Sequence, residues 1–450
     1  MPPPLVSALE VPDSGSVAAP PSSANATGLA RIAAIDAVRG LAVLGILVMN
    51  VVEFAWPFEA YENPAYAGGR EGMDLATWFV QVTLFDGKMR ALFSMLFGAG
   101  LVLLADRLVQ SGRAASAADL LLRRCLWLVP FGILHRFLLQ WSGDILYQYG
   151  LLGLLAVAFR NLRARTLIGL GVLVLALSAP GHLLTWSRLT ELRAAAHEAE
   201  AVARDGGVVT PELEAARRRW RARTESIPPP PATVQAEVTA MRGDYAAVFA
   251  HRWNYHHTFQ SAYLYYVFVF DVFGMMLLGM GLMRLGFFAG TCRRWVHLAA
   301  LGGGVLGASC AGALAFAWQQ QGFSNESPDL WLARELTYPW SRTLVALAWA
   351  SVVVLAVRAG RAVAVTRTLG SVGRLAFSNY VLQTVCCSLW FFGYGFGRYG
   401  TQSRSELMVV VLVVTAIQVV GSGLWSRWFR IGPLEWAWRS LTYWRLQPLR

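Results

Sequence analysis

Apolar stretches recur along the whole chain, and most have about the 20 residues that a helix needs to cross the hydrocarbon core of a membrane. They cover 32–54, 82–105, 120–140, 144–160, 166–186, 262–284, 295–318, 340–357, 370–392 and 407–429. Only 15% of the 450 residues are charged and 56% are hydrophobic, which excludes an ordinary soluble globular protein. We therefore predict an all-α polytopic membrane protein with about ten transmembrane helices in a lipid bilayer.

The basic residues indicate the orientation of these helices. The chain carries a net charge of +12, and its arginines fall mostly in the short loops after the second, fourth, sixth, eighth and tenth apolar stretches. Short loops rich in Arg and Lys stay on the cytoplasmic side. This distribution predicts that both termini are cytoplasmic, and it does not predict a nucleic-acid partner.

Composition divides the chain into five segments. Residues 1–30 are rich in Pro, Ser and Ala without a basic start, so we expect a disordered cytoplasmic tail and no signal peptide. Two membrane bundles of five spans each are expected, at 31–187 and 261–430. Between them, 188–260 is a polar segment with helical composition and a run of four prolines, which predicts a small periplasmic helical insert. Residues 431–450 predict an aromatic, basic tail in the cytoplasmic interface.

The first predicted span contains charged and polar side chains: Asp36, Arg39 and Asn50. A charge at the centre of a lipid-facing helix costs about 3 kcal/mol, so these groups should face protein or a polar cavity. Asp36 and Arg39 lie three residues apart and can pair on one helical face. Gly40 follows directly and permits close approach of another helix. The pair either organises a buried polar site or holds the bundle together.

The turn between the third and fourth spans contains His135 and Asp144. A membrane-embedded imidazole can act as a base or nucleophile, with a carboxylate fixing its tautomer. The alternative is a histidine that only hydrogen-bonds within the bundle.

Asp86, Lys88 and Arg90 interrupt the second apolar stretch, which indicates an interfacial helix that turns into the bundle. The trio fits anion recognition or an internal network of ion pairs. Lys88 is the only lysine in the sequence. A desolvated ammonium changes its pKa readily whereas a guanidinium does not, so Lys88 either has a specific task or is a chance exception to an arginine-rich composition.

Further candidate substrate-binding residues are scattered along the chain. Asp271 is an intramembrane carboxylate, Asn379 is a polar residue of the ninth span, and Arg123, Arg124 and Arg374 are cytoplasmic arginines suited to phosphate groups. We expect no metal site, because the cysteines lack ligand spacing and the histidines around Arg252 read as part of an interfacial aromatic belt.

Taken together, several motifs resemble the DUF418 family, the YeiB-like bacterial inner-membrane proteins. They are IDAVRGLAVLGILVMN, DGKMRALFSMLFGAGL, GILH with GDIL, GRLAFSNYVLQ and GPLEWAWRSLTY. They span nearly the whole chain in order, apart from the first 30 residues and 188–260. The resemblance implies a multi-pass protein of the bacterial inner membrane.

The family is in turn similar, in its first helices, to transmembrane acyltransferases such as the heparan-α-glucosaminide N-acetyltransferase and acyltransferase-3 groups. That similarity implies that Asp36 and Arg39 organise a site, that Asn50 polarises the reacting carbonyl, and that Asp86 matches an acid of the second span. The acetyltransferase group has a catalytic histidine soon after the first span, and residues 51–74 contain none. Either His135 replaces it from another helix, or the chemistry is changed or lost.

These observations lead to two main hypotheses. In the first, an acyl group moves from a cytoplasmic acyl-CoA co-substrate to a hydroxyl or amine of a small-molecule, glycan or lipid acceptor, with His135 as base. In the second, Asp36, Asp271 and His135 form the path of a proton-coupled transporter or exporter without covalent chemistry. A structural or sensory role is the third alternative.

Overall fold

The computed structural model describes residues 23–67, 69–224, 231–258 and 268–450, and all regular structure in these ranges is helical. The first half contains α1 (Ser23–Ala55), α2 (Phe58–Glu62), η1 (Pro64–Ala67), α3 (Gly72–Val80), η2 (Gln81–Phe85), α4 (Lys88–Gln110), η3 (Ala114–Ser116), α5 (Ala117–Leu126), α6 (Leu128–Phe137), α7 (Leu146–Ala158), α8 (Ala164–Ala176) and α9 (Ala179–Arg204). Residues 1–22 of the predicted tail lie outside the described residues.

The second half contains α10 (Pro211–Thr224), α11 (Pro231–Met241), α12 (Tyr245–Thr258), α13 (Gly274–Arg284), α14 (Arg294–Gln320), α15 (Pro328–Arg358), α16 (Val363–Arg374), α17 (Ala376–Phe391), α18 (Leu407–Trp428) and α19 (Pro433–Tyr443). The membrane class predicted from the sequence is confirmed. Six helical stretches, at Ala33–Ala55, Gly72–Gln110, Ala164–Arg204, Arg294–Gln320, Pro328–Arg358 and Leu407–Trp428, are long and apolar enough to cross a membrane.

The other four predicted spans form shorter helices. Stretch 120–140 divides into α5 and α6, because the ring of Pro130 cannot continue the hydrogen bonding of α5. Stretch 144–160 contains α7, a shorter apolar helix, and 370–392 is divided between α16 and α17. The start of stretch 262–284 lies outside the described residues, and its end forms α13.

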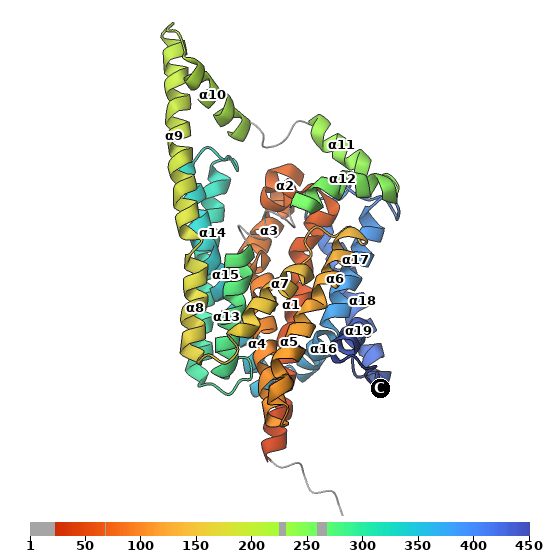
Figure 1. The fold of residues 1–450 in the computed structure, drawn as a ribbon. Helices are drawn as coiled ribbons and strands as arrows, with labels where there is room; N and C mark the ends of the chain where they lie inside the picture. The colour runs from red at the N-terminus through yellow and green to blue at the C-terminus, as the bar shows by residue number, and fades with distance from the viewer. Residues whose placement is uncertain (1–22, 68, 225–230, 259–267) are drawn as a thin grey trace, which may run out of the picture.

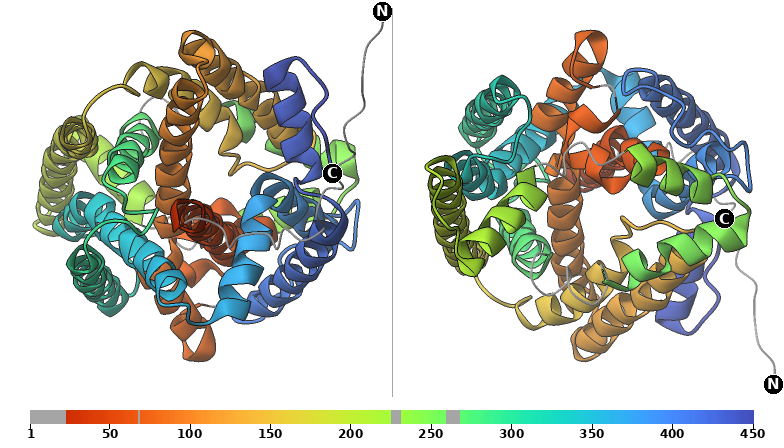
Figure 2. Two further views of the ribbon diagram at one scale, coloured as in Figure 1. Left: turned by 90° about the horizontal axis from the view of Figure 1, so that it is seen from below. Right: turned by 90° about the horizontal axis from the view of Figure 1, so that it is seen from above.

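The helices form an upright bundle with α1 near its middle (Figure 1). α1 contacts α4, α15, α16, α17 and α18. Seen from either end, α8, α14 and α15 lie on one side and α17 to α19 on another (Figure 2). The visible start of α1 and the C-terminus lie toward the lower end of Figure 1, and α9 to α12 occupy the upper end. We use "lower end" and "upper end" in this sense throughout.

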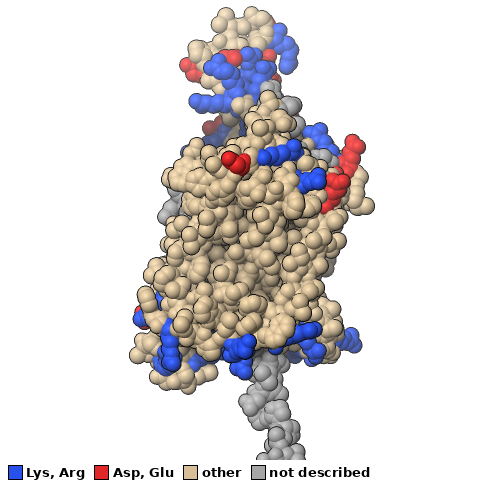
Figure 3. All heavy atoms as spheres, turned by 90° about the vertical axis from the view of Figure 1, so that its right-hand side faces the viewer, with Lys and Arg blue, Asp and Glu red and all other residues tan. Residues whose placement is uncertain are grey.

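The distribution of side chains fits a bilayer. Valines and leucines of the α1 interior, such as Val43, Leu47 and Val51, are fully buried. On α18, by contrast, Val409, Leu412 and other large apolar side chains are exposed. Figure 3 shows a broad belt of uncharged side chains between two charged ends. A surface this apolar is stable against lipid and would be a liability in water.

The division between α16 and α17 is held by a residue from the C-terminal helix. The Glu435 carboxylate of α19 accepts hydrogen bonds from the Phe377 and Ser378 backbone amides, at 2.7 and 3.2 Å, and from the Ser378 hydroxyl. These contacts satisfy amide groups that α17 leaves free in its first turn. The predicted interfacial tail is therefore attached to the bundle through a helix cap.

Candidate functional site

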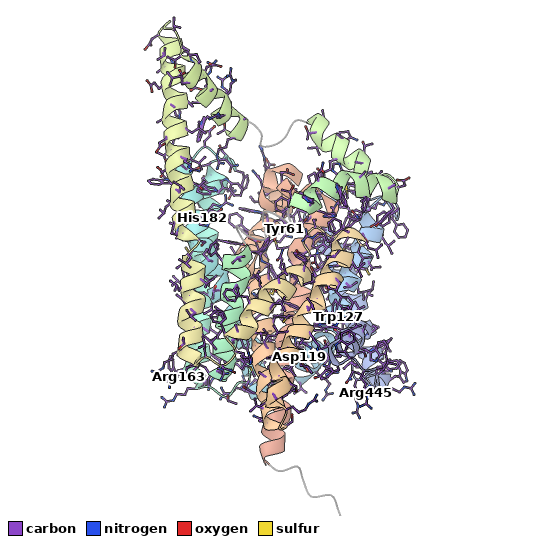
Figure 4. All side chains as sticks on the ribbon, in the orientation of Figure 1. Tyr61, Asp119, Trp127, Arg163, His182 and Arg445 are labelled. Carbon is purple, nitrogen blue, oxygen red and sulfur yellow. The ribbon has the colours of Figure 1, made fainter. Side chains whose placement is uncertain are left out.

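A cavity of about 1070 Å³ lies in the upper half of the bundle. Its walls come from the upper part of α1, the η2–α4 junction, α15 and the α8–α9 junction, with further residues from α7 and the segment before α13. Tyr61 and His182 line it, and Figure 4 places both well above Asp119, Arg163 and Arg445. Six predicted site residues line this cavity: Asn50, Asp86, Lys88, Arg90, Asp144 and Asp271.

The η2–α4 junction places three of these residues on the wall. Residues 81–85 form a π-helical turn, and the helix stops at Asp86. Gly87 then adopts a left-handed backbone (φ 67°) before α4 starts at Lys88. A Cβ at Gly87 would lie 2.3 Å from the Tyr338 hydroxyl, so glycine is needed both for the turn and for the contact. The sequence predicted an interruption at this point.

Two arginines from different helices form ion pairs with the Asp271 carboxylate. Its carboxylate accepts from Arg90 Nη2 at 2.8 Å, from Arg342 Nη1 at 2.8 Å and from Arg342 Nη2 at 2.6 Å. The Asp271 and Arg342 side chains are only 7% and 5% exposed. The Nε atoms of both arginines are buried and have no hydrogen-bond partner in the described chain. Two positive charges thus meet one negative charge at this point of the bundle.

Asp86 and Lys88 have different surroundings. Asp86 Oδ1 accepts a hydrogen bond from the Tyr61 hydroxyl at 2.9 Å, and the Asp86 side chain remains partly accessible from the cavity. The Lys88 ammonium is 1% exposed and donates to the Val82 carbonyl of the π-helical turn. Lys88 therefore links the start of α4 to the π-helical turn and adds a positive charge beside Asp86.

Two amide side chains also face the cavity. In the part of the chain that the structure describes, Asn50 makes no side-chain hydrogen bond, so its amide can contact a bound molecule. Gln148 is buried, and its Oε1 has no partner among the described residues. Unpaired polar atoms are costly in a low-dielectric wall. The cavity is consequently suited to a molecule with both donor and acceptor groups.

His135 lies in a separate buried cluster. Its Nδ1 is 2.8 Å from Asp144 Oδ1 and its Nε2 is 2.8 Å from Thr384 Oγ1. Asp144 also accepts from the Leu146 and Tyr147 amides and so caps the start of α7. Asp144 reaches the cavity wall, but His135, at 2% exposure, does not line the cavity. The three groups tie α6, α7 and α17 together.

Asp36 and Arg39 lie further down α1, below the cavity. They form the predicted pair, with Arg39 Nη1 2.8 Å from Asp36 Oδ1. Neither residue lines the cavity. Gly40 packs against α16, where a Cβ would lie 1.9 Å from the Leu369 carbonyl oxygen. Gly40 therefore packs α1 closely against α16, and both interpretations of the Asp36–Arg39 pair stay predictions.

The remaining predicted residues lie at other contacts. Arg123 pairs with Asp119 on the surface of α5, and the Arg124 guanidinium stacks 3.7 Å from the Trp438 ring centroid. Asn379 is buried and donates to Val372 O and Ser422 Oγ. Arg374 lines a smaller pocket at the lower end. The predicted polar residues therefore form several groups and not one chamber.

Sequence reasoning missed Arg342, Tyr61 and Gln148. Arg342 lies two residues after the start of the predicted span 340–357. Asp271 was selected because it is a charged residue inside a predicted span, and the same criterion could have identified Arg342. The other two are ordinary residues of helical segments, and nothing in their sequence neighbourhood marks them. Within the described ranges, no group of three or more His, Cys, Asp or Glu could hold a metal ion.

Comparison with known proteins gives the family. Residues 282–445 match the family described as "Protein of unknown function (DUF418)". The Escherichia coli (strain K12) "Uncharacterized protein YeiB" is 31% identical over 425 residues, which cover 92% of this chain and 96% of that protein. The chain belongs to the DUF418 family. No solved structure matches it.

A second DUF418 relative shows similar coverage. The Bacillus subtilis (strain 168) "Uncharacterized protein YxaH" is 26% identical over 443 residues, covering 93% of this chain and 96% of that protein. The similarity to both bacterial proteins thus extends through the cavity-lining helices of both halves. This DUF418 protein is a multi-pass membrane protein, and neither relative's name indicates an activity.

Proposed function

We propose that this DUF418 protein is a membrane-embedded acyltransferase whose acceptor binds in the upper cavity. The observation that carries the proposal is that Asp86 and Asn50 line one cavity, together with five lysine and arginine side chains, among them Lys88 and Arg90. The resemblance to transmembrane acyltransferases assigns these same two positions to an acid and to a carbonyl-polarising amide. His135 is enclosed and takes no direct part in this version of the mechanism.

The proposed reaction uses groups that are accessible from the cavity. The Asp86 carboxylate accepts the proton of the acceptor hydroxyl or amine, whose oxygen or nitrogen attacks the acyl carbonyl. Asn50 donates a hydrogen bond to the oxygen as negative charge develops on it. The new bond to the acyl carbon forms as the thioester C–S bond breaks, and the departing thiolate takes up a proton. Lys88 and Arg90 add positive potential around the developing charge.

The acyl donor is proposed to be an acyl-CoA from the cytoplasm. The cytoplasmic side is assigned to the lower end because Figure 3 shows Lys and Arg along it with few acidic side chains, whereas the upper end carries both signs of charge, and this follows the positive-inside pattern. On this assignment both termini are cytoplasmic, the chain crosses the bacterial inner membrane about ten times, and 188–260 forms a periplasmic insert. Arg123, Arg124 and Arg374 lie on the donor side in this scheme.

One observation favours proton-coupled transport as a second candidate. Asp271 is a buried carboxylate held by two arginines from separate helices, and such groups can couple proton uptake to the movement of a solute. In this case the cavity would bind the transported solute, and the protein would catalyse no covalent reaction. The two candidates differ in whether a covalent product appears.

The test uses purified protein in lipid vesicles with radiolabelled acetyl-CoA and an extract of membrane lipids and glycans as acceptors. We expect label in an acceptor with the native sequence, and a loss of at least about 100-fold in Asp86→Asn if Asp86 is the general base. Asn50→Ala should lose a similar factor in kcat with little change in KM, because its hydrogen bond strengthens only in the transition state.

Asp119→Asn is the matched control, since this α5 carboxylate is 58% exposed and remote from the cavity. It should keep full activity. Folded protein that transfers no label to any acceptor, or Asp86→Asn with native activity, would contradict the acyltransferase. Uptake of protons with a solute, abolished in Asp271→Asn and accompanied by no acylated product, would establish the second candidate.

A further inference from the structure

Four arginines from three separate segments gather around a pocket of about 430 Å³ at the lower end. Arg374 is the last residue of α16, Arg427 lies in the last turn of α18, and Arg430 follows that helix. Arg450 completes the group. It is brought close by the backbone hydrogen bond from Arg430 N to the Leu449 carbonyl, 3.2 Å long. The remaining lining residues are Ser426, Trp428 and Phe429.

The charge of this arginine pocket is not balanced by acidic side chains among its lining residues. None of its lining residues is acidic. In the described ranges, none of the four guanidinium groups takes part in an ion pair. The ends of α16 and α18 each contribute about half a negative charge and the main-chain carboxylate of Arg450 about one, which four full positive charges together exceed. Like charges held together in this way favour binding of an anion.

Two further features indicate that the pocket is suited to binding a ligand. The Ser426 hydroxyl lies on the pocket wall, is buried, and has no hydrogen-bond partner in the described part of the chain. It can donate to an anionic oxygen between the guanidinium groups. Trp428 is 61% exposed beside the pocket, and the Phe429 ring lies 5.6 Å from the Arg450 guanidinium carbon. Aromatic side chains of this kind mark the boundary between lipid and water.

We propose that the arginine pocket binds a phosphate-bearing anion at the membrane surface. Guanidinium groups bind phosphate oxygens in pairs, and several arginines together suit a phosphate or a diphosphate. The phosphate can belong to the headgroup of an anionic lipid in the adjacent leaflet or to a soluble diphosphate-containing molecule such as coenzyme A. The site is separate from the upper cavity, and the proposal stands without the acyltransferase.

The experiment measures thermal stabilisation of delipidated, detergent-solubilised protein over a concentration series of each probe. The probes are phosphatidylglycerol, phosphatidylcholine, coenzyme A and inorganic diphosphate. We expect at least one phosphate anion to stabilise the protein more than phosphatidylcholine does. Stabilisation by phosphatidylglycerol alone identifies a lipid site, and stabilisation by coenzyme A and diphosphate identifies a soluble ligand.

Arg427→Gln combined with Arg430→Gln removes half of the pocket's positive charge. We expect the apparent affinity to fall at least about tenfold, since each lost charge-assisted hydrogen bond weakens binding substantially. The matched control combines Arg361→Gln with Arg367→Gln, two exposed arginines between α15 and α16 and within α16 that do not line the pocket. This control changes the net charge equally and should bind like the native protein. Equal losses in both double variants, or no preference for phosphate anions in the native protein, would overturn the proposal.

Discussion

Gly373 of α16 lies directly against the backbone of Asp36 in α1, so closely that a Cβ at Gly373 would be 1.8 Å from the Asp36 carbonyl oxygen. Gly40 makes the reciprocal contact with Leu369. The two glycines allow α1 and α16 to touch backbone to backbone, which is the close approach that small residues permit in membranes. Side chains at these positions must separate the helices.

Gly373→Ala should therefore destabilise the protein by about 1–3 kcal/mol, the usual cost of overpacking a tight contact. Gly370→Ala on the same helix is the control, because no described atom outside its local helix lies within 4 Å of the added Cβ. Its stability should equal or exceed the native value, since alanine favours a helix more than glycine does. Thermal midpoints of both variants in detergent measure the difference. Equal midpoints would show that the α1–α16 contact is not as close as described.

The Asp271 bridge gives a second prediction. Asp271→Asn removes the carboxylate and leaves the buried Arg342 and the partly buried Arg90 without their counter-charge, so we expect a loss of about 3–5 kcal/mol. Asp119→Asn breaks the exposed pair with Arg123 and should cost at most about 1 kcal/mol. Unfolding in a mixed-micelle titration with sodium dodecyl sulfate measures both. A small effect at Asp271 would mean that lipid or water already screens the arginines.

His256 predicts a dependence of stability on pH. Burial, together with the positive charges of Arg252 and Arg136, lowers the pKa of this α12 imidazole to about 2. Its Nε2 is 3.3 Å from Gln140 Oε1, and its Nδ1 has no hydrogen-bond partner among the described residues. Below the unfolded-state pKa of 6.5 the unfolded chain takes up a proton that the folded protein excludes.

Stability should accordingly fall as the pH drops from 6.5 to 5, by about 1.4 kcal/mol per pH unit for this group. His256→Gln should reduce this slope, because the neutral amide can still contact Gln140 without gaining a proton. His197→Gln, at an exposed position of α9, serves as control and should keep the native slope. A slope that is unchanged in His256→Gln would exclude this histidine as its source.

The orientation of the bundle can be tested with single cysteines in a background without the five native ones. Val208 is 92% exposed in the loop between α9 and α10, and Leu446 is 77% exposed after α19. With the lower end cytoplasmic, Val208→Cys should react in intact cells with a maleimide that cannot cross the membrane. Leu446→Cys should react only after permeabilisation. The reverse pattern would invert the proposed topology.

Features that depend on local sequence could be predicted well. The apolar stretches predicted the membrane class, and Gly40 predicted a close contact between helices. The charged residues at 86–90 predicted the break before α4. Partners on distant helices could not be predicted, because one sequence does not say which helices become neighbours. Arg342 lies 71 residues after Asp271, and Thr384 lies 249 residues after His135. This is why the predicted site residues divide between the upper cavity and several separate contacts, a division that the sequence alone did not indicate.

Each described residue that lines the upper cavity belongs to the upper or middle part of the bundle, whereas α1 and α16 meet backbone to backbone below it. A molecule held beside Asp86 is thus separated from the lower end, along this line, by two helices that leave no room for side chains between their backbones. A molecule arriving from the lower end can follow this line only where the α1 and α16 backbones separate.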